Sequence, residues 1–200
     1  MGKLDNQEII LGAGEVYMYE VEGALSEVPT ADEIETEAHN VGHCSGGFSV
    51  DYKPEKYDVK NQYGTIVKSA ITSEEMTAKT GVLRWDLQNI GLLSCAKFEV
   101  DRTTKMKKLI FGGSGVKLKT VLLRFVHVKE NGKKIRFTMI GQGGNGFAIE
   151  FGEKELTVDA EITAISYLKD FLAEFSEEMT DAEFTAWEAD NPAPKVNAPS

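Results

Sequence analysis

Apolar and polar residues alternate in short runs between residues 46 and 94, and this period of two predicts β-strands. In residues 48–53, three apolar side chains alternate with Ser, Asp and Lys, so one face of the strand is apolar and the other polar. Pro54 interrupts this run, which is typical of an edge strand, a bulge or a turn. The alternation resumes at residue 57, and two further extended segments are predicted over residues 65–70 and 75–80.

One short amphipathic helix is predicted after these strands. Leu83, Leu87 and Ile90 have the spacing i, i+4 and i+7, which gathers them on one stripe of a helix over about residues 82–94. The residues at 80–81 are expected to begin this helix, because threonine and glycine are both favoured at helix N-termini.

The second half of the chain contains the clearest hairpin. Residues 119–129 and 134–142 are strongly apolar and flank Asn131-Gly132, the preferred pair for a tight reversal between strands. Further strands are predicted over residues 15–21, 97–102, 107–111, 147–151 and 156–171, the first partly buried on both faces and the last a long closing strand. The sequence therefore predicts a mainly β, antiparallel sandwich or barrel with one flanking helix.

Two acidic segments interrupt or follow this β pattern. Residues 23–41 form a long connection without clear periodicity, and a loop of this length is either functional or flexible surface filler. We expect one β domain over residues 1–175 that includes this loop, followed by an acidic extension over residues 176–200. The extension is expected to form a few helical turns before Pro192 and to be disordered over its last eight residues.

Charge is unevenly distributed along the 200 residues, whose net charge is −10. Residues 1–40 carry a net charge of −9, residues 170–200 carry −7, and the body between them carries +6. The overall charge disfavours general nucleic-acid binding, which depends on clustered cations. A basic body with acidic ends allows copies to join head to tail, although solvated acidic termini on a mixed surface account for the same pattern.

No group of residues in the sequence predicts catalysis, a metal site or a cofactor. Cys44 and Cys95 match no ligand spacing or redox motif, and His43 beside Cys44 does not complete a metal site. His127 lies in an apolar strand, where a histidine is more often a core residue than a base. The chain is therefore expected to be a non-enzymatic protein with reduced thiols, made in the cytoplasm. It lacks the roughly 18 consecutive apolar residues of a membrane span.

In the order of its features, the sequence resembles the major tail tube proteins of bacteriophages with long, non-contractile tails. The resemblance covers roughly residues 10–172 and rests on diffuse motifs rather than a fingerprint. These are GAGEVYMYEV at 12–21, the pattern GxxxGGFSVDY at 42–52, a polar hairpin through Gly64-Thr65, VLRWDLQNIGLLS at 82–94 and KELTVDAEITAISYLKD at 154–170. The acidic loop near residues 27–37 and the tail after residue 176 depart from the family pattern.

The resemblance implies a structural virion protein with a tail tube fold. Such subunits form hexameric rings, and the rings stack into a tube that conducts the genome during ejection. The implied partners are other copies of the chain, the tape-measure protein and the tail-tip and terminator proteins, with DNA only in passage and no cofactor. An inner tube protein of a contractile tail, a phage-like bacteriocin or a secretion apparatus would share this fold. A monomeric β-sandwich binding module is a further alternative.

Two sets of residues follow as hypotheses. Strands with one polar face suit a tube wall that is wet on its inner side, and acids there would repel the phosphates of passing DNA. The candidate lumen-facing residues are Ser49, Asp51, Asp58 and Lys60. The acids of the long loop are candidates for contacts between rings or subunits, and these are Glu27, Asp32, Glu33, Glu35 and Glu37.

Overall fold

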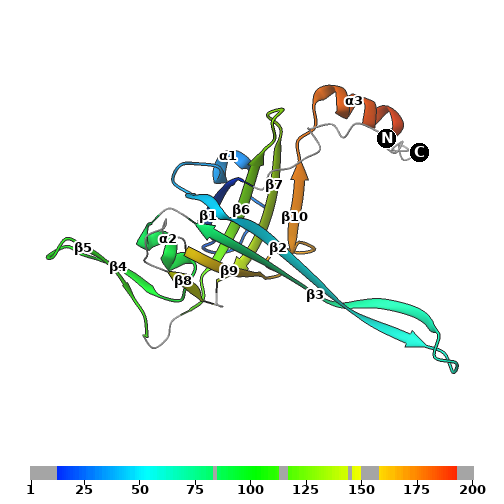
Figure 1. The fold of residues 1–200 in the computed structure, drawn as a ribbon, viewed down its shortest axis with the longest axis horizontal. Helices are drawn as coiled ribbons and strands as arrows, with labels where there is room; N and C mark the ends of the chain where they lie inside the picture. The colour runs from blue at the N-terminus through cyan, green and yellow to red at the C-terminus, as the bar shows by residue number, and fades with distance from the viewer. Residues whose placement is uncertain (1–12, 83–84, 113–116, 144–145, 150–157, 193–200) are drawn as a thin grey trace, which may run out of the picture.

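The computed structural model describes residues 13–82, 85–112, 117–143, 146–149 and 158–192, and over these the chain is mainly β (Figure 1). Eight strands form one antiparallel sheet in the order β10-β7-β6-β1-β2-β3-β9-β8, and β4 and β5 form a separate two-stranded sheet. The elements in chain order are β1 (Glu15–Glu20), α1 (Ala31–Ile34), β2 (Asn40–Lys60), β3 (Ile66–Val82), α2 (Leu87–Leu92), β4 (Lys97–Asp101), β5 (Met106–Ile110), β6 (Thr120–Val128), β7 (Lys134–Gln142), β8 (Phe147–Ile149), β9 (Val158–Ala164), β10 (Ala173–Glu177) and α3 (Asp181–Asp190).

The large sheet closes on itself through β7. One edge of β7 pairs with β6 along its whole length, while the other edge pairs with β10 up to Met139 and with β9 from Gly141. Because β9 also pairs with β3, strands β7, β6, β1, β2, β3 and β9 form a closed ring. A Cβ atom at Gly141 would lie 2.5 Å from the carbonyl oxygen of Thr163 on β9, so glycine is what permits the close approach. The predicted sandwich or barrel is therefore a barrel of antiparallel strands.

Two apolar clusters lie on the two faces of the central strands. The inner cluster fills the barrel and includes Val16, Met18, Leu123, Phe137 and Ile162, all at most 2% exposed. The outer cluster lies on the opposite face of the same strands, and its members are Tyr17, Val21, Ile34, Leu122, Val126, Ile140 and Leu168. The expectation that both faces of β1 are partly buried is confirmed, because its neighbours Val16 and Tyr17 belong to different clusters.

The hairpin of β2 and β3 continues far beyond the barrel (Figure 1). β1 pairs with β2 only over Asn40–His43, and β9 pairs with β3 only over Thr77–Val82. Beyond these pairings each strand is bonded only to the other among the described strands, and the two predicted segments after residue 65 are one continuous strand. The sequence left an edge, a bulge or a turn open at Pro54, and Pro54 lies within the outer part of β2, one residue before the bulge that follows Glu55.

Two elements differ in their boundaries from the sequence prediction, and a third forms where it is predicted. The helix predicted over residues 82–94 is confined to α2, because β3 continues through Val82 in its pairing with β9, and Asp86 rather than residues 80–81 caps the helix. The closing strand predicted over residues 156–171 ends at Ala164, and the chain then turns into β10, which the sequence analysis missed. The predicted helical turns of the extension form α3, while residues 193–200 lie outside the described part.

The acidic connection 23–41 is partly structured. α1 lies within it, and the first two residues of β2 fall before residue 42. The side chain of Ile34 at the end of α1 is fully buried in the outer cluster. The expected boundary between domain and extension, at residue 175, falls inside β10.

A matched pair of phenylalanines tests the location of the core. Phe137 and Phe175 face each other across β7 and β10 with ring centroids 4.6 Å apart, yet Phe137 is 1% exposed and Phe175 is 64% exposed. Phe137→Ala should lower the free energy of unfolding of the monomer by about 3–5 kcal/mol, because it leaves a cavity in the barrel. Phe175→Ala should lower it by about 0.5 kcal/mol or less. Urea denaturation of both variants measures this, and equal losses would contradict the assignment of the core.

Candidate assembly surfaces

The outer part of the β2–β3 hairpin, residues 52–75, is here called the projecting arm. Its residues are exposed apart from Asp58, which is half-buried, and they include large apolar side chains. Tyr57 and Ile71 are each 63% exposed, and Tyr63 at the tip is 82% exposed. An isolated two-stranded hairpin is marginally stable in water, and an apolar surface that the chain itself does not cover typically marks an interface.

Cross-strand contacts hold the projecting arm in one conformation before any partner binds. The Ser69 hydroxyl donates a hydrogen bond to Asp58, and this bond holds the pKa of the Asp58 carboxyl below its usual value. The Ser73 hydroxyl donates to Glu55, 2.9 Å away. The Tyr52 hydroxyl donates to Glu74, and this contact raises the pKa of the tyrosine. A preformed arm loses less conformational freedom on binding than a flexible loop would.

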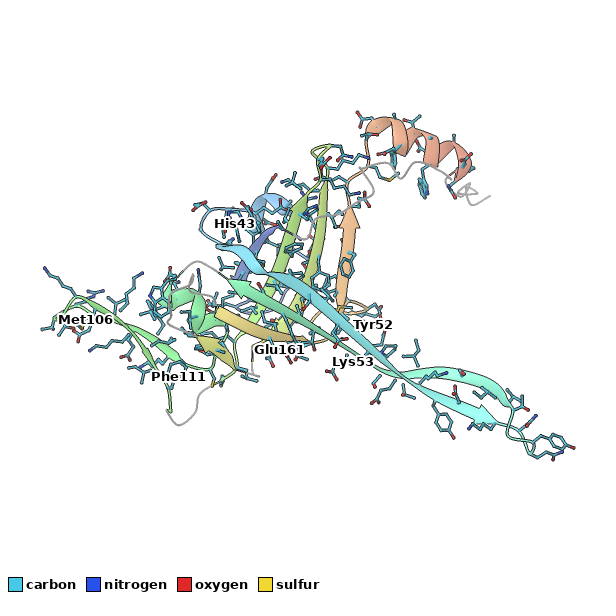
Figure 2. All side chains as sticks on the ribbon, viewed as in Figure 1. His43, Tyr52, Lys53, Met106, Phe111 and Glu161 are labelled. Carbon is cyan, nitrogen blue, oxygen red and sulfur yellow. The ribbon has the colours of Figure 1, made fainter. Side chains whose placement is uncertain are left out.

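Where the arm leaves the barrel, the outward face of β2, β3 and β9 carries charges of both signs. We call this the mixed-charge face, and its members are Ser49, Asp51, Lys53, Lys79 and Glu161 (Figure 2). Lys53 pairs with Asp51 at 2.8 Å, and Lys79 pairs with Glu161 at 2.9 Å. Beside β8 the face is hollowed by an open depression of about 590 Å³. Lys53 and Lys79 are therefore each paired with an acid, and both side chains are more than half exposed to solvent.

The structure divides the four candidate lumen residues between two faces of β2. Both bulges in the outer hairpin add their extra residue to β3, so β2 alternates regularly from residue 49 to residue 60. Ser49 and Asp51 therefore lie on the mixed-charge face. Asp58 and Lys60 lie on the opposite face, because their positions along β2 differ by odd numbers from those of Ser49 and Asp51. The sequence allowed a bulge or a turn at Pro54, but β2 continues through Pro54 without an extra residue.

Of the candidate contact residues in the acidic loop, Glu33 accepts hydrogen bonds from the backbone N–H and the hydroxyl of Thr30 at the start of α1, and Glu35 is bonded to the barrel. The Glu35 side chain is only 9% exposed and accepts hydrogen bonds from Lys134 at 3.0 Å and Arg136 at 2.5 Å, with the Arg124 guanidinium 3.8 Å away. Arg124 also donates to the carbonyl oxygen of Pro29 at 3.3 Å. These bonds fasten the loop to β6 and β7. The other candidates, Glu27, Asp32, Glu33 and Glu37, are exposed.

Sequence reasoning could not find the partners of Glu35. Its hydrogen-bonding residues lie about a hundred positions later in the chain and come together with it only when β7 joins the sheet. The charge pattern gave one hint, since Arg124, Lys134 and Arg136 interrupt otherwise apolar strands. A buried or half-buried cation in a strand normally has an acidic partner.

The pKa of Glu35 makes the loop contact sensitive to acid. Burial raises this pKa, but the hydrogen bonds from Arg136 and Lys134 outweigh burial and hold the pKa below its ordinary value. A carboxyl group with a lowered pKa in the folded state stabilises the protein above the pKa of the unfolded state. That contribution is lost as the pH falls through the folded-state value.

Glu35→Gln should therefore lower the free energy of unfolding by about 2 kcal/mol at pH 7. The difference from the wild type should shrink towards zero as the pH falls below the ordinary pKa of a glutamate, about 4.3, and through the lower folded-state pKa of Glu35. Urea denaturation at several pH values measures it. Glu27→Gln, in an exposed position of the same loop, is the control and should match the wild type at pH 7. A pH-independent loss in Glu35→Gln would show that its charge does not hold the loop.

The described residues contain no group of three or more His, Cys, Asp or Glu side chains placed to hold a metal ion. Over the same residues, none of the helices has the length and apolar character needed to cross a lipid bilayer. Neither models of known protein families nor curated protein sequences match this chain. Function is therefore inferred from the geometry of the chain itself and from the resemblance described above.

Proposed function

We propose that this chain is the tail tube subunit of a long, non-contractile bacteriophage tail, in which hexameric rings stack into a tube that conducts DNA. The observation that carries the proposal is the projecting arm. Its apolar side chains are ordered and exposed in the single chain, and a second copy is the partner that would cover them in a tube. The subunit would assemble in the host cytoplasm, with the tape-measure, tail-tip and terminator proteins as further partners.

Unpaired strand edges support a repeating assembly. β10 and β8 end the large sheet, and both strands of the projecting arm have a free edge. Such edges are a liability in an isolated protein, because they pair with other chains. In a closed ring each unpaired edge pairs with the next subunit, so these edges form the contacts between subunits. The arm is long enough to reach beyond its own barrel towards a neighbouring subunit (Figure 1).

The mixed-charge face supports the passage of DNA. A duplex slides through a tube only when its phosphates find no cluster of uncompensated cations. Lys53 and Lys79 are each paired with an acid on this face, so it suits the lumen wall. We therefore assign Ser49 and Asp51 to the lumen and place Asp58 and Lys60 on the side of the arm that faces away from it.

The first test is negative-stain electron microscopy of the purified protein at high concentration, together with its sedimentation velocity. We expect hollow rings or tubes with sixfold symmetry. The variant Tyr57→Asp/Ile71→Asp changes two exposed residues and should keep the monomer folded while abolishing the rings. Circular dichroism of the variant controls for folding. Identical sedimentation profiles for the two proteins would remove the projecting arm from the contact and overturn the proposal.

The lumen assignment is tested by charge reversal. In Asp51→Lys/Glu161→Lys, two acids of the mixed-charge face become cations, which frees Lys53 and Lys79 from their partners. Tubes of this variant should still assemble but retain about tenfold more duplex DNA. Co-sedimentation of labelled DNA with the tubes measures this retention.

Asp58→Lys is the matched control, because Asp58 lies on the opposite face of β2. It should leave DNA retention unchanged in whatever tubes it forms. Higher retention by Asp58→Lys than by the double variant would place the other face of β2 in the lumen.

A further inference from the structure

A second hairpin, formed by β4 and β5, leaves the barrel on the side away from the projecting arm (Figure 1). Within the described residues it is a two-stranded sheet with no third strand, and it exposes large apolar side chains. Met106 and Phe111 are 58% and 57% exposed, and Val100 is 56% exposed (Figure 2). A hairpin of this kind is marginal in water unless something covers it.

The β4–β5 hairpin is also basic. Residues 97–111 contain five basic and two acidic side chains, which gives a net charge of +3 in a chain whose total is −10. Both acids are used within the hairpin, since Glu99 pairs with Lys97 and Asp101 pairs with Lys108. Arg102 and Lys105 at the turn form no ion pair with any residue of the described part of the chain. Their charges are available to a partner.

The segment formed by β10 and α3 has the complementary character. Residues 173–190 contain seven acidic side chains and no basic one. Phe175, Met179, Phe184 and Trp187 are between 50% and 64% exposed, and α3 has no buried residue. Three acids of the segment pair with the barrel, Glu177 with Lys129, Glu178 with Arg136 and Glu183 with Lys133, while Glu188 and Asp190 form no ion pair with the described residues. A helix of ten residues is marginal in isolation.

The last turn of α3 points to an external partner. Glu188 and Asp190 lie near the C-terminal end of the helix, where the helix dipole disfavours negative charge, and no basic residue is present in that turn to offset them. The two aromatic rings of Phe184 and Trp187 lie 6.2 Å apart and form one apolar patch beside these acids. Acids and apolar rings together match the cations and apolar side chains of the β4–β5 hairpin.

The two segments lie apart in one molecule, because the β4–β5 hairpin leaves one side of the barrel and α3 lies beyond β10 on another (Figure 1). We infer that the β4–β5 hairpin of one copy docks on the β10–α3 segment of a neighbouring copy, through its basic turn and its exposed apolar side chains. This inference rests on the proposed self-assembly and names one of its contacts. The contact is head-to-tail, and such a contact closes a ring when the rotation between neighbouring copies returns to the first copy.

The acidic loop before β2 is a weaker partner for the basic hairpin. Glu35 and Ile34 fasten that loop to its own barrel, as described above. Residues 13–51 of the described chain expose no large apolar side chain that could match Met106 and Phe111. The β10–α3 segment supplies both charge and apolar surface.

The test is a charge swap read by sedimentation velocity and electron microscopy. One variant reverses the hairpin, Arg102→Glu/Lys105→Glu, and a second reverses the helix, Glu188→Lys/Asp190→Lys. Each alone should raise the protein concentration needed for assembly about tenfold, because attractive pairs become repulsive ones. The combined variant should return to within about threefold of the wild type. The helix variant should melt no earlier than the wild type, since cations are favoured at a helix C-terminus.

A disulfide trap reads the contact directly. In a Cys95→Ser background, Met106→Cys mixed with Trp187→Cys should form a crossed dimer on mild oxidation, and Met106→Cys mixed with Tyr63→Cys should not. Loss of assembly in both charge variants without rescue in the combined variant would overturn the inference. Unchanged assembly in either variant would also overturn the proposed contact, but it would leave the proposed assembly into a tube intact. A wild type that does not assemble, together with no crossed dimer from the two cysteine variants, would remove the proposed function together with this contact.

Discussion

The exchange of backbone partners along β7 is the constraint on which the rest of the structure depends. β7 gives its outer edge first to β10 and then, from Gly141, to β9. This second pairing closes the barrel around Phe137 and Ile162, which have almost no exposed surface. Because closure uses only the inner ends of β2 and β3, the outer ends of these strands leave the barrel without neighbours.

Closure therefore leaves strand edges unpaired and apolar side chains exposed outside the barrel. The strands of a closed barrel have no free edges. Among the described residues, the projecting arm and the β4–β5 hairpin keep unpaired edges, and α3 has no buried residue. All three carry exposed large side chains at distant points of the molecule (Figure 1). A protein that folds in this way keeps a compact centre stable while it offers several separate contacts, which suits a repeating assembly better than a single binding cleft.

The acidic segments of the chain have different roles despite their similar composition. The segment before β2 turns inward, where Glu35 bonds to Lys134 and Arg136 and Ile34 fills the outer apolar cluster. The segment that begins with β10 also pairs with barrel cations near its start, but α3 has no buried residue. The two segments are alike in composition, and burial of an apolar side chain beside the acid distinguishes the one that is packed into its own barrel.

The sequence by itself determined the elements whose neighbours along the chain are also their neighbours in space. The hairpin around Asn131-Gly132 and the strand period near Phe48 are local patterns, and the strands lie where these patterns predict them. The mainly β class and the division of β2 into an apolar and a polar face follow from the same local rule.

Only the tertiary structure decided where the ends of elements fall and which charges are used internally. α2 begins late because β3 is held in the sheet by β9, and Glu35 is withdrawn from the surface by residues of β7. Asp58 and Asp51 look alike in sequence but lie on opposite faces because β2 continues through Pro54. Pairing between distant strands sets these outcomes, and a hydrogen bond between residues far apart in the chain leaves no periodic trace in the sequence.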